Sequence, residues 1–228
     1  MKKVSASKKI EKTQKIAIPR RIDMALLKAY GWSEEAPNVR FEFKKTLKLA
    51  KFPPAKLPAN SLLRLGCSAA GKKLGYAGKA VPAAGIEARP PKNFAELKRV
   101  NRSAHRDYLK TWGKKAGGFF LTAAKKYETK YLPKTRSLVM LRKGKPVALY
   151  SLLKFPARSG IVDVVAWHGP FVKLSAKELR SVKHQASVWL NSAARHHLAV
   201  GLDYFDKESL RFFAGLGFKV DRILVVRM

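Results

Sequence analysis

The chain has 228 residues, of which 48 are Lys or Arg and 15 are Asp or Glu, so its formal net charge is +33. This length accommodates one domain of common size together with a substantial extension. The single cysteine, Cys67, excludes an intramolecular disulfide, and no run approaches the roughly 20 apolar residues of a membrane-spanning helix. We expect an intracellular, cytoplasmic protein, and the basic residues 1–21 leave import into an organelle open.

The positive charge is spread along the chain rather than confined to a tail. Residues 1–92 carry +15 and residues 93–228 carry +18. Because self-repulsion of this size opposes compaction, we expect a polyanionic neighbour: RNA, DNA, a ribosome or an anionic membrane surface. A solvated cationic surface with no such partner is the alternative.

The N-terminal part is predicted to hold little regular structure. Residues 1–20 contain too few large apolar side chains to order, Ile22–Tyr30 is expected to form a short helix, and Val39–Phe43 alternates like a strand. Residues 53–91 are rich in Ala, Gly, Pro and Lys, which predicts an extended arm or linker. Within that arm, candidates for nucleic-acid contact are Lys72, Lys73, Tyr76 and Lys79.

A helical region follows. Asn93 can cap a helix that runs to Trp112 and breaks at Gly113, and a second helix is expected from Phe119 to Tyr131. Lys114 and Lys115, which follow Trp112 and Gly113, are further candidates for nucleic-acid contact.

Three antiparallel strands and a long helix come next. The strands are Ser137–Arg142, Pro146–Leu153 and Ile161–Trp167, and a tight basic turn joins the first two. Ser175 and Glu178 stand in the capping-box relation at the start of a helix predicted over residues 176–197.

The last 31 residues predict strand, short helix and strand. Leu198, Val200 and Leu202 alternate as in a half-buried strand, residues 209–213 form a helical turn, and residues 223–226 form a closing strand. Either Gly215 or Gly217 can supply the positive φ that ends the helix.

This C-terminal segment resembles the end of the GCN5-related N-acetyltransferase (GNAT) family. The family pattern is a strand, an Asn, a small residue three positions on, an aromatic pair and Leu-Gly-Phe, and the matching residues here are Ser209, Phe212, Leu216, Gly217 and Phe218. The resemblance covers about residues 93–228. It implies an α/β fold, with a mixed, mostly antiparallel sheet flanked by helices, in residues 93–228. Composition and charge predict that a basic, partly disordered extension, residues 1–92, precedes it.

The resemblance also implies acetyl-CoA, or another acyl-CoA, as acyl donor. In the family the donor lies where the third of these strands and the strand after the long helix part, with its pyrophosphate on a glycine-containing loop before the helix. This chain has no glycine between Gly169 and Gly201. Lys173, Ser175 and Lys177 are the candidates for phosphate contact, and the alternative is that Ser175 and Glu178 only cap the helix.

Three further positions near the donor follow from the family motif. Asp206 stands in place of the Asn, Ser209 holds the small-residue position, and Phe213 replaces the Tyr that often protonates the departing thiolate. Phenylalanine has no proton to donate.

The candidate bases are His168, Asp163 and Asp203, because they lie in or beside the strands that line the family's cleft. A strand-end histidine paired with backbone or water is the alternative for His168. No spacing suits a zinc site or a Walker loop, so no metal is expected.

Three functions stay open at this point. The first is a GNAT-like N-acyltransferase that acts near a polyanion. The second is a catalytically inactive GNAT-fold protein that binds RNA or a ribosome, and the third is a transferase that takes its acyl group from an aminoacyl-tRNA.

Overall fold

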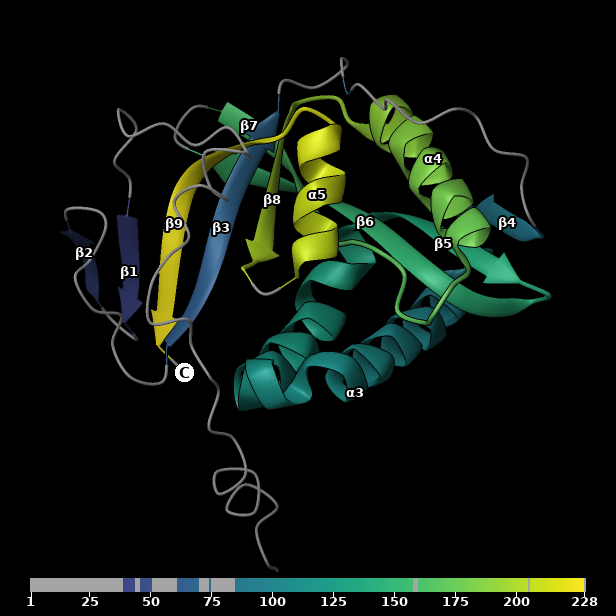
Figure 1. Ribbon diagram of the computed structural model, residues 1–228, viewed down its shortest axis with the longest axis horizontal. Coiled ribbons are helices and arrows are strands. Elements are labelled where there is room, and N and C mark those ends of the chain that lie inside the picture. The colour runs from purple at the N-terminus through teal and green to yellow at the C-terminus, as the bar shows by residue number, and fades with distance from the viewer. Residues whose placement is uncertain are drawn as a thin grey trace, which may run out of the picture.

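A computed structural model describes residues 39–43, 46–50, 61–69, 74, 85–157, 160–204 and 206–227 (Figure 1). The predictions for residues 1–20 and for the helix at residues 22–30 lie outside these ranges. So do Lys72, Lys73, Tyr76 and Lys79, and the side chains of Lys114 and Lys115 are outside the described part as well.

One sheet organises the fold, with strand order β2-β1-β9-β3-β8-β7-β6-β5-β4. Neighbouring strands are antiparallel except for the pairs β1·β9 and β7·β8, so the predicted mixed, mostly antiparallel sheet is confirmed. The strands are β1 (Val39–Phe43), β2 (Thr46–Ala50), β3 (Ser61–Ala69), β4 (Ile86–Arg89), β5 (Arg136–Arg142), β6 (Lys145–Ala157), β7 (Gly160–Trp167), β8 (His197–Asp203) and β9 (Lys219–Arg227).

The interpretation of residues 53–91 as an arm or linker is wrong at two strands. β3 lies between β8 and β9 and is antiparallel to both, and β4 pairs with β5 at an edge of the sheet. Leu65, Cys67 and Ala69 alternate along β3 and are buried in the main core. The sheet therefore includes strands from the N-terminal side of residue 93.

The predicted hairpin is confirmed in β5 and β6. Lys143 and Gly144 form its two-residue turn with φ values of 50° and 74°. Positive φ at both turn positions matches the right-handed twist of the flanking strands. β7 then adds antiparallel to β6, as expected.

Helix α3 (Phe94–Lys126) is one continuous helix, so the predicted break at Gly113 is wrong. A glycine inside a helix costs only about 1 kcal/mol, which the rest of a long helix can offset. Its predicted cap is confirmed, because the backbone N–H of Glu96 donates to Oδ1 of Asn93 at 2.9 Å. A π-helical turn (Tyr127–Tyr131) and a 3₁₀ turn (Leu132–Lys134) follow it.

Helix α4 (Ala176–Ala193) begins at the predicted capping box and ends four residues before the predicted end. The early end has a local cause. The carboxylate of Asp163 accepts hydrogen bonds from the backbone N–H groups of Arg195 and His196, at 2.7 and 2.9 Å, and so holds the turn into β8.

Helix α5 (Lys207–Gly215) ends in a Schellman motif at Gly217. The N–H of Phe218 donates to the carbonyl of Phe213, and the N–H of Gly217 donates to that of Ala214. Gly217 has a φ of 90°, so it is the residue that supplies the left-handed conformation.

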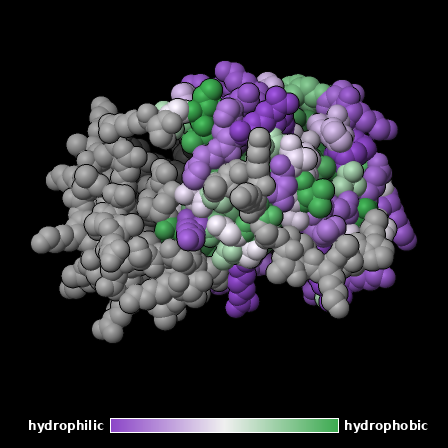
Figure 2. All heavy atoms as spheres, turned by 90° about the horizontal axis from the view of Figure 1, so that it is seen from above, coloured by the Kyte–Doolittle hydropathy of each residue, from purple (hydrophilic) through white to green (hydrophobic). Residues whose placement is uncertain are grey.

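The helices cover both faces of the sheet. α4 and α5 lie side by side in front of it in Figure 1 and bury the main core, which includes Val182, Leu190 and Leu210. α3 packs a second cluster on the opposite face, with Val139 and Leu149. Among the described residues, no helix is both long and apolar enough to cross a membrane. Figure 2 shows a face on which hydrophilic side chains predominate over the described part.

Candidate functional site

The parallel strands β7 and β8 part at one end of the sheet. Their pairing runs from Val162↔His197 to Val165↔Val200, but β7 continues to Trp167 and β8 to Asp203. Beyond that point β7 stays with β6, and residues 201–203 of β8 pair with β3. The separation that the GNAT resemblance implied is therefore present.

The chain after β7 follows β6 still further. The N–H of Leu149 donates to the carbonyl of Gly169 at 3.3 Å, and the N–H of Phe171 donates to that of Val147 at 3.1 Å. Gly169 permits this course because its φ is 97°, which favours glycine. His168 is thus fixed at the mouth of the separation.

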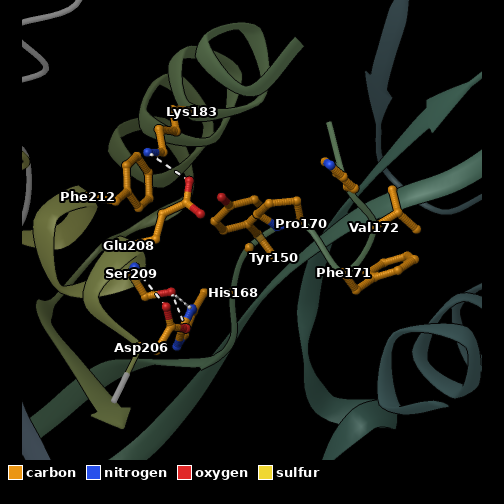
Figure 3. Close-up of a pocket in the computed structure, with 12 residues that line it drawn as sticks. Tyr150, His168, Pro170, Phe171, Val172, Lys183, Asp206, Glu208, Ser209 and Phe212 are labelled. Atoms are coloured by element: carbon orange, nitrogen blue, oxygen red, sulfur yellow. Dashed lines mark hydrogen bonds and ion pairs between the residues drawn. The ribbon is translucent and has the colours of Figure 1, made fainter. Parts of the chain in front are cut away.

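A pocket of about 270 Å³ opens beside His168, between the loop after β7, helix α4 and the start of α5 (Figure 3). This volume is near the lower end of the range for small-molecule sites, so the pocket suits a small group or one arm of a larger ligand. It is lined by Tyr150, His168, Gly169, Pro170, Phe171, Val172, Lys173, Lys183, Asp206, Glu208, Ser209 and Phe212.

His168 is the predicted base that the structure places in this pocket. Its Nδ1 lies 3.4 Å from Oγ of Ser209, and its ring meets the ring of Phe213 edge to face with centroids 5.1 Å apart. Burial lowers the pKa of His168 below 6.5, against the opposing charges of Asp206 and Asp203. The imidazole is therefore neutral at pH 7 and able to accept a proton.

Asp206 and Ser209 form the polar start of helix α5. Asp206 is the N-cap, and its carboxylate accepts from the backbone N–H of Ser209 at 3.1 Å and from the Ser209 hydroxyl at 2.7 Å. The carboxylate thus orients the serine rather than the imidazole. This order differs from a hydrolase triad, in which the carboxylate holds the histidine.

Asp203 and Asp163 are not in the pocket lining. Asp203, at the end of β8, forms an ion pair with Arg64 at 2.9 Å, and it acts on His168 through its charge. Asp163 is fully buried, forms an ion pair with Arg136 at 3.2 Å and holds the α4–β8 turn. These contacts give Asp163 a structural role, and its role as a base stays a prediction.

Phe213 is not among the residues that line this pocket. It is fully buried against Phe212 and Phe218 and faces the core, whereas Phe212 lines the pocket. Phe213 packs edge to face against the ring of His168.

The N-terminus of α4, beside the phosphate candidates Ser175 and Lys177, carries a capping box and a carboxylate. Ser175 and Glu178 form a reciprocal capping box, and Glu178 also forms an ion pair with Arg142 at 3.1 Å. Hydrogen bonds from the Ser175 backbone and from Arg142 lower the pKa of Glu178, so it is charged. A carboxylate at this position repels a phosphate, and the alternative in which these residues only cap the helix is the one the geometry supports.

Only one of the three phosphate candidates lies in the pocket lining. Lys173 lines the pocket, whereas Lys177 is exposed in the first turn of α4 and Ser175 is exposed as its cap. Sequence reasoning missed Tyr150, Lys183 and Glu208, which come from β6, α4 and α5. Each sits in an element whose sequence pattern shows only packing or solvation, and the tertiary arrangement alone brings them together.

No family model matches this chain, and no curated protein matches it. Among solved structures it is similar to a putative acetyltransferase from the GNAT family of Novosphingobium aromaticivorans, with 13% identity, a TM-score of 0.38 and coverage of 75% of this chain and 67% of that one. It is also similar to a GCN5-related N-acetyltransferase from Kribbella flavida, with 14% identity, a TM-score of 0.42 and coverage of 71% and 57%.

A tandem GNAT protein from the clavulanic acid biosynthesis pathway is a further similar structure, with 13% identity and a TM-score of 0.42. The matched region covers 72% of this chain and 52% of that protein. The GNAT-like fold is defined in this chain by its own topology: hairpin, third strand, long helix, parallel strand, short helix and closing strand around parted β7 and β8.

Proposed function

We propose that the protein is a GNAT-like N-acyltransferase that transfers an acyl group, such as acetyl, from an acyl-CoA to an amine, near a polyanionic partner. The observation that carries this proposal is the position of His168, at the mouth of the parted strands and in the lining of a pocket of about 270 Å³.

Two residues of the pocket supply the proton transfers that amide formation needs. His168 accepts the proton that the amine loses as it attacks the acyl carbonyl carbon. Tyr150 lines the same pocket and carries a phenolic proton, so it can protonate the departing thiolate in place of the missing motif tyrosine. The thioester supplies only the activated acyl group.

The test is release of thiol from acetyl-CoA in the presence of a panel of primary amines. We expect His168→Gln to lower kcat by about 10²-fold or more, as for loss of a general base, with the fold unchanged by circular dichroism. Wild-type protein that releases no thiol with any amine, and shows no thermal shift with any acyl-CoA, would remove the CoA-dependent form of the proposal. A ligand at 100 times its Kd is expected to stabilise the protein by about 2.7 kcal/mol.

A second candidate is a catalytically inactive GNAT-fold protein that binds RNA or a ribosome. The capped N-terminus of α4 and the net charge of +33 favour it. Its cations would include Lys72, Lys73, Lys79, Lys114 and Lys115, with Tyr76 as a stacking residue. RNA affinity should then fall with salt, with a log–log slope of about −0.7 per phosphate contact for a single strand.

The same capped helix favours a variant of the enzyme in which the acyl group arrives on an aminoacyl-tRNA. Such a donor needs no diphosphate site at α4, and its aminoacyl group is of a size suited to the pocket. Amine-dependent discharge of aminoacyl-tRNA, without thiol release from acetyl-CoA, would distinguish this donor from CoA.

A further inference from the structure

An ion pair spans the pocket between helices α4 and α5. Nζ of Lys183 lies 3.3 Å from Oε1 of Glu208, and Figure 3 shows the two side chains reaching toward each other beside Phe212. Lys183 is seven residues after the first residue of α4, about 10 Å along the helix. This position is well away from the capped N-terminus that repels phosphate.

The charges around the pocket differ in how firmly they are held. Asp206 is committed to the cap of α5 through two hydrogen bonds. The side chain of Glu208, by contrast, is 58% exposed. An ion pair at such a position contributes little to the free energy of unfolding, because solvent screens the two charges. Lys173, on the loop after β7, is exposed and has no hydrogen bond or ion pair within the described part of the chain.

The pocket therefore has two cations that an anionic ligand could recruit: Lys173 directly, and Lys183 by exchange with Glu208. We propose that Lys183 and Lys173 hold the phosphate-bearing end of the acyl donor from the side of α4, and that Glu208 is a built-in competitor which this phosphate displaces. The inference rests on the proposed acyl transfer. It places the phosphate about 10 Å along α4 from the helix N-terminus, where the carboxylate of Glu178 opposes a phosphate.

The competition gives opposite signs to two substitutions. Lys183→Met removes the phosphate partner, and it should weaken acetyl-CoA binding about tenfold or more, since a hydrogen bond to a charged group is lost. Glu208→Gln removes the competitor and should tighten acetyl-CoA binding about threefold. Neither change should alter the affinity for S-acetylpantetheine, which carries the thioester without phosphate.

Matched controls lie on the same helix. Lys177→Met removes an exposed α4 lysine outside the pocket lining, and Glu178→Gln removes the carboxylate at the α4 N-terminus. Both should leave the calorimetric Kd of acetyl-CoA within about twofold, because neither side chain lies in the proposed phosphate site. Circular dichroism and thermal melts check that all four variants fold.

Three results overturn the inference. One is an unchanged Kd in both Lys183→Met and Glu208→Gln. Another is weakening by Lys177→Met or tightening by Glu178→Gln of the size predicted for the pocket variants, which would return the phosphate to the N-terminus of α4. The third is equal affinity of wild-type protein for acetyl-CoA and S-acetylpantetheine. This result would contradict the phosphate site and leave the proposed acyl transfer intact. If neither thioester binds, the acyl-CoA proposal falls with it.

Discussion

Nδ1 of His168 lies 3.4 Å from Oγ of Ser209, although the two residues belong to segments on opposite sides of the parted strands. His168 follows β7, and Ser209 lies in the first turn of α5, which follows β8. The contact therefore spans the separation that the pairing of β7 and β8 leaves open. Movement of α5 relative to β7 would change the surroundings of the proposed base.

The first prediction concerns the titration of His168. Its pKa is lowered by burial, so the unfolded chain binds a proton at a higher pH than the folded protein does. Between the folded pKa and about 6.5, the free energy of unfolding should rise with pH and be lost as pH falls. NMR titration should place the His168 midpoint below 6.5.

His105, whose pKa is also lowered by burial, contributes in the same direction. The comparison of wild type with His168→Gln isolates the share of His168, because His105 is common to both. A His168 midpoint above 6.5 would show that Asp206 and Asp203 outweigh burial.

The second prediction concerns Asp163. Asp163→Asn should destabilise the protein by about 3 kcal/mol, because it leaves Arg136 without its partner and places an amide N–H₂ where two backbone N–H groups need an acceptor. The control is Glu87→Gln, which affects an ion pair of a carboxylate that is 60% exposed and should cost less than about 0.5 kcal/mol.

Urea unfolding measures both variants. The titration of His168 should stay unchanged in Asp163→Asn. A loss of acyl transfer in folded Asp163→Asn, without a loss of stability, would restore the catalytic role predicted from sequence.

The third prediction tests the attachment of β4 to helix α3. Hydrogen bonds from Arg89 and from the Lys92 backbone lower the pKa of Glu96 to about 2, from an ordinary value of 4.5. Because the folded pKa is the lower one, Glu96 stabilises the fold above about pH 4.5, and this contribution is lost as pH falls toward 2.

Glu96→Gln should therefore lower Tm at pH 7 and have little effect near pH 2. Glu87→Gln is the control, since Glu87 also contacts Arg89 but is 60% exposed, and its effect should be smaller at every pH. Equal Tm values for wild type and Glu96→Gln at pH 7 would show that the hydrogen bonds of Glu96 do not stabilise the attachment of β4 to α3.

The fourth prediction separates the two glycines at the end of α5. Gly217→Ala should cost about 1 kcal/mol or more, because the residue has a φ of 90°. Gly215→Ala should be neutral or stabilising by up to about 1 kcal/mol, since Gly215 is helical and an added Cβ meets nothing within 4 Å. Thermal melts give both values, and the reverse order would contradict the Schellman assignment.

Local signals allowed much of the fold to be predicted. The capping box at Ser175, the turn at Lys143–Gly144 and the alternation along residues 198–202 each depend on a few neighbouring residues, and each is confirmed. The long-range pairing was not predictable in this way. β3 is an alternating strand inside a segment rich in Ala, Gly and Pro, and its neighbours β8 and β9 are far away in sequence.

The residues of the candidate site also fall into those that local sequence signals predict and those that depend on tertiary packing. His168, Ser209 and Asp206 could be placed from the strand end and from the motif, and they do lie together. Lys183 and Glu208 could not, because an ion pair between two helices depends on how those helices pack. Asp163 lies outside the pocket lining as a buried acceptor, and the sequence did not predict this, because a buried acceptor and a catalytic base look alike beside a strand.

The most direct test of the central claim is an NMR titration of the protein, with its histidine rings labelled, using acetyl-CoA. His168 faces the pocket, whereas His196 and His197 lie at the opposite end of the β7·β8 pairing. The account predicts that the His168 resonance shifts with a saturating dependence on acetyl-CoA, while those of His196 and His197 stay in place. An unmoved His168 resonance at concentrations that saturate the protein would contradict it.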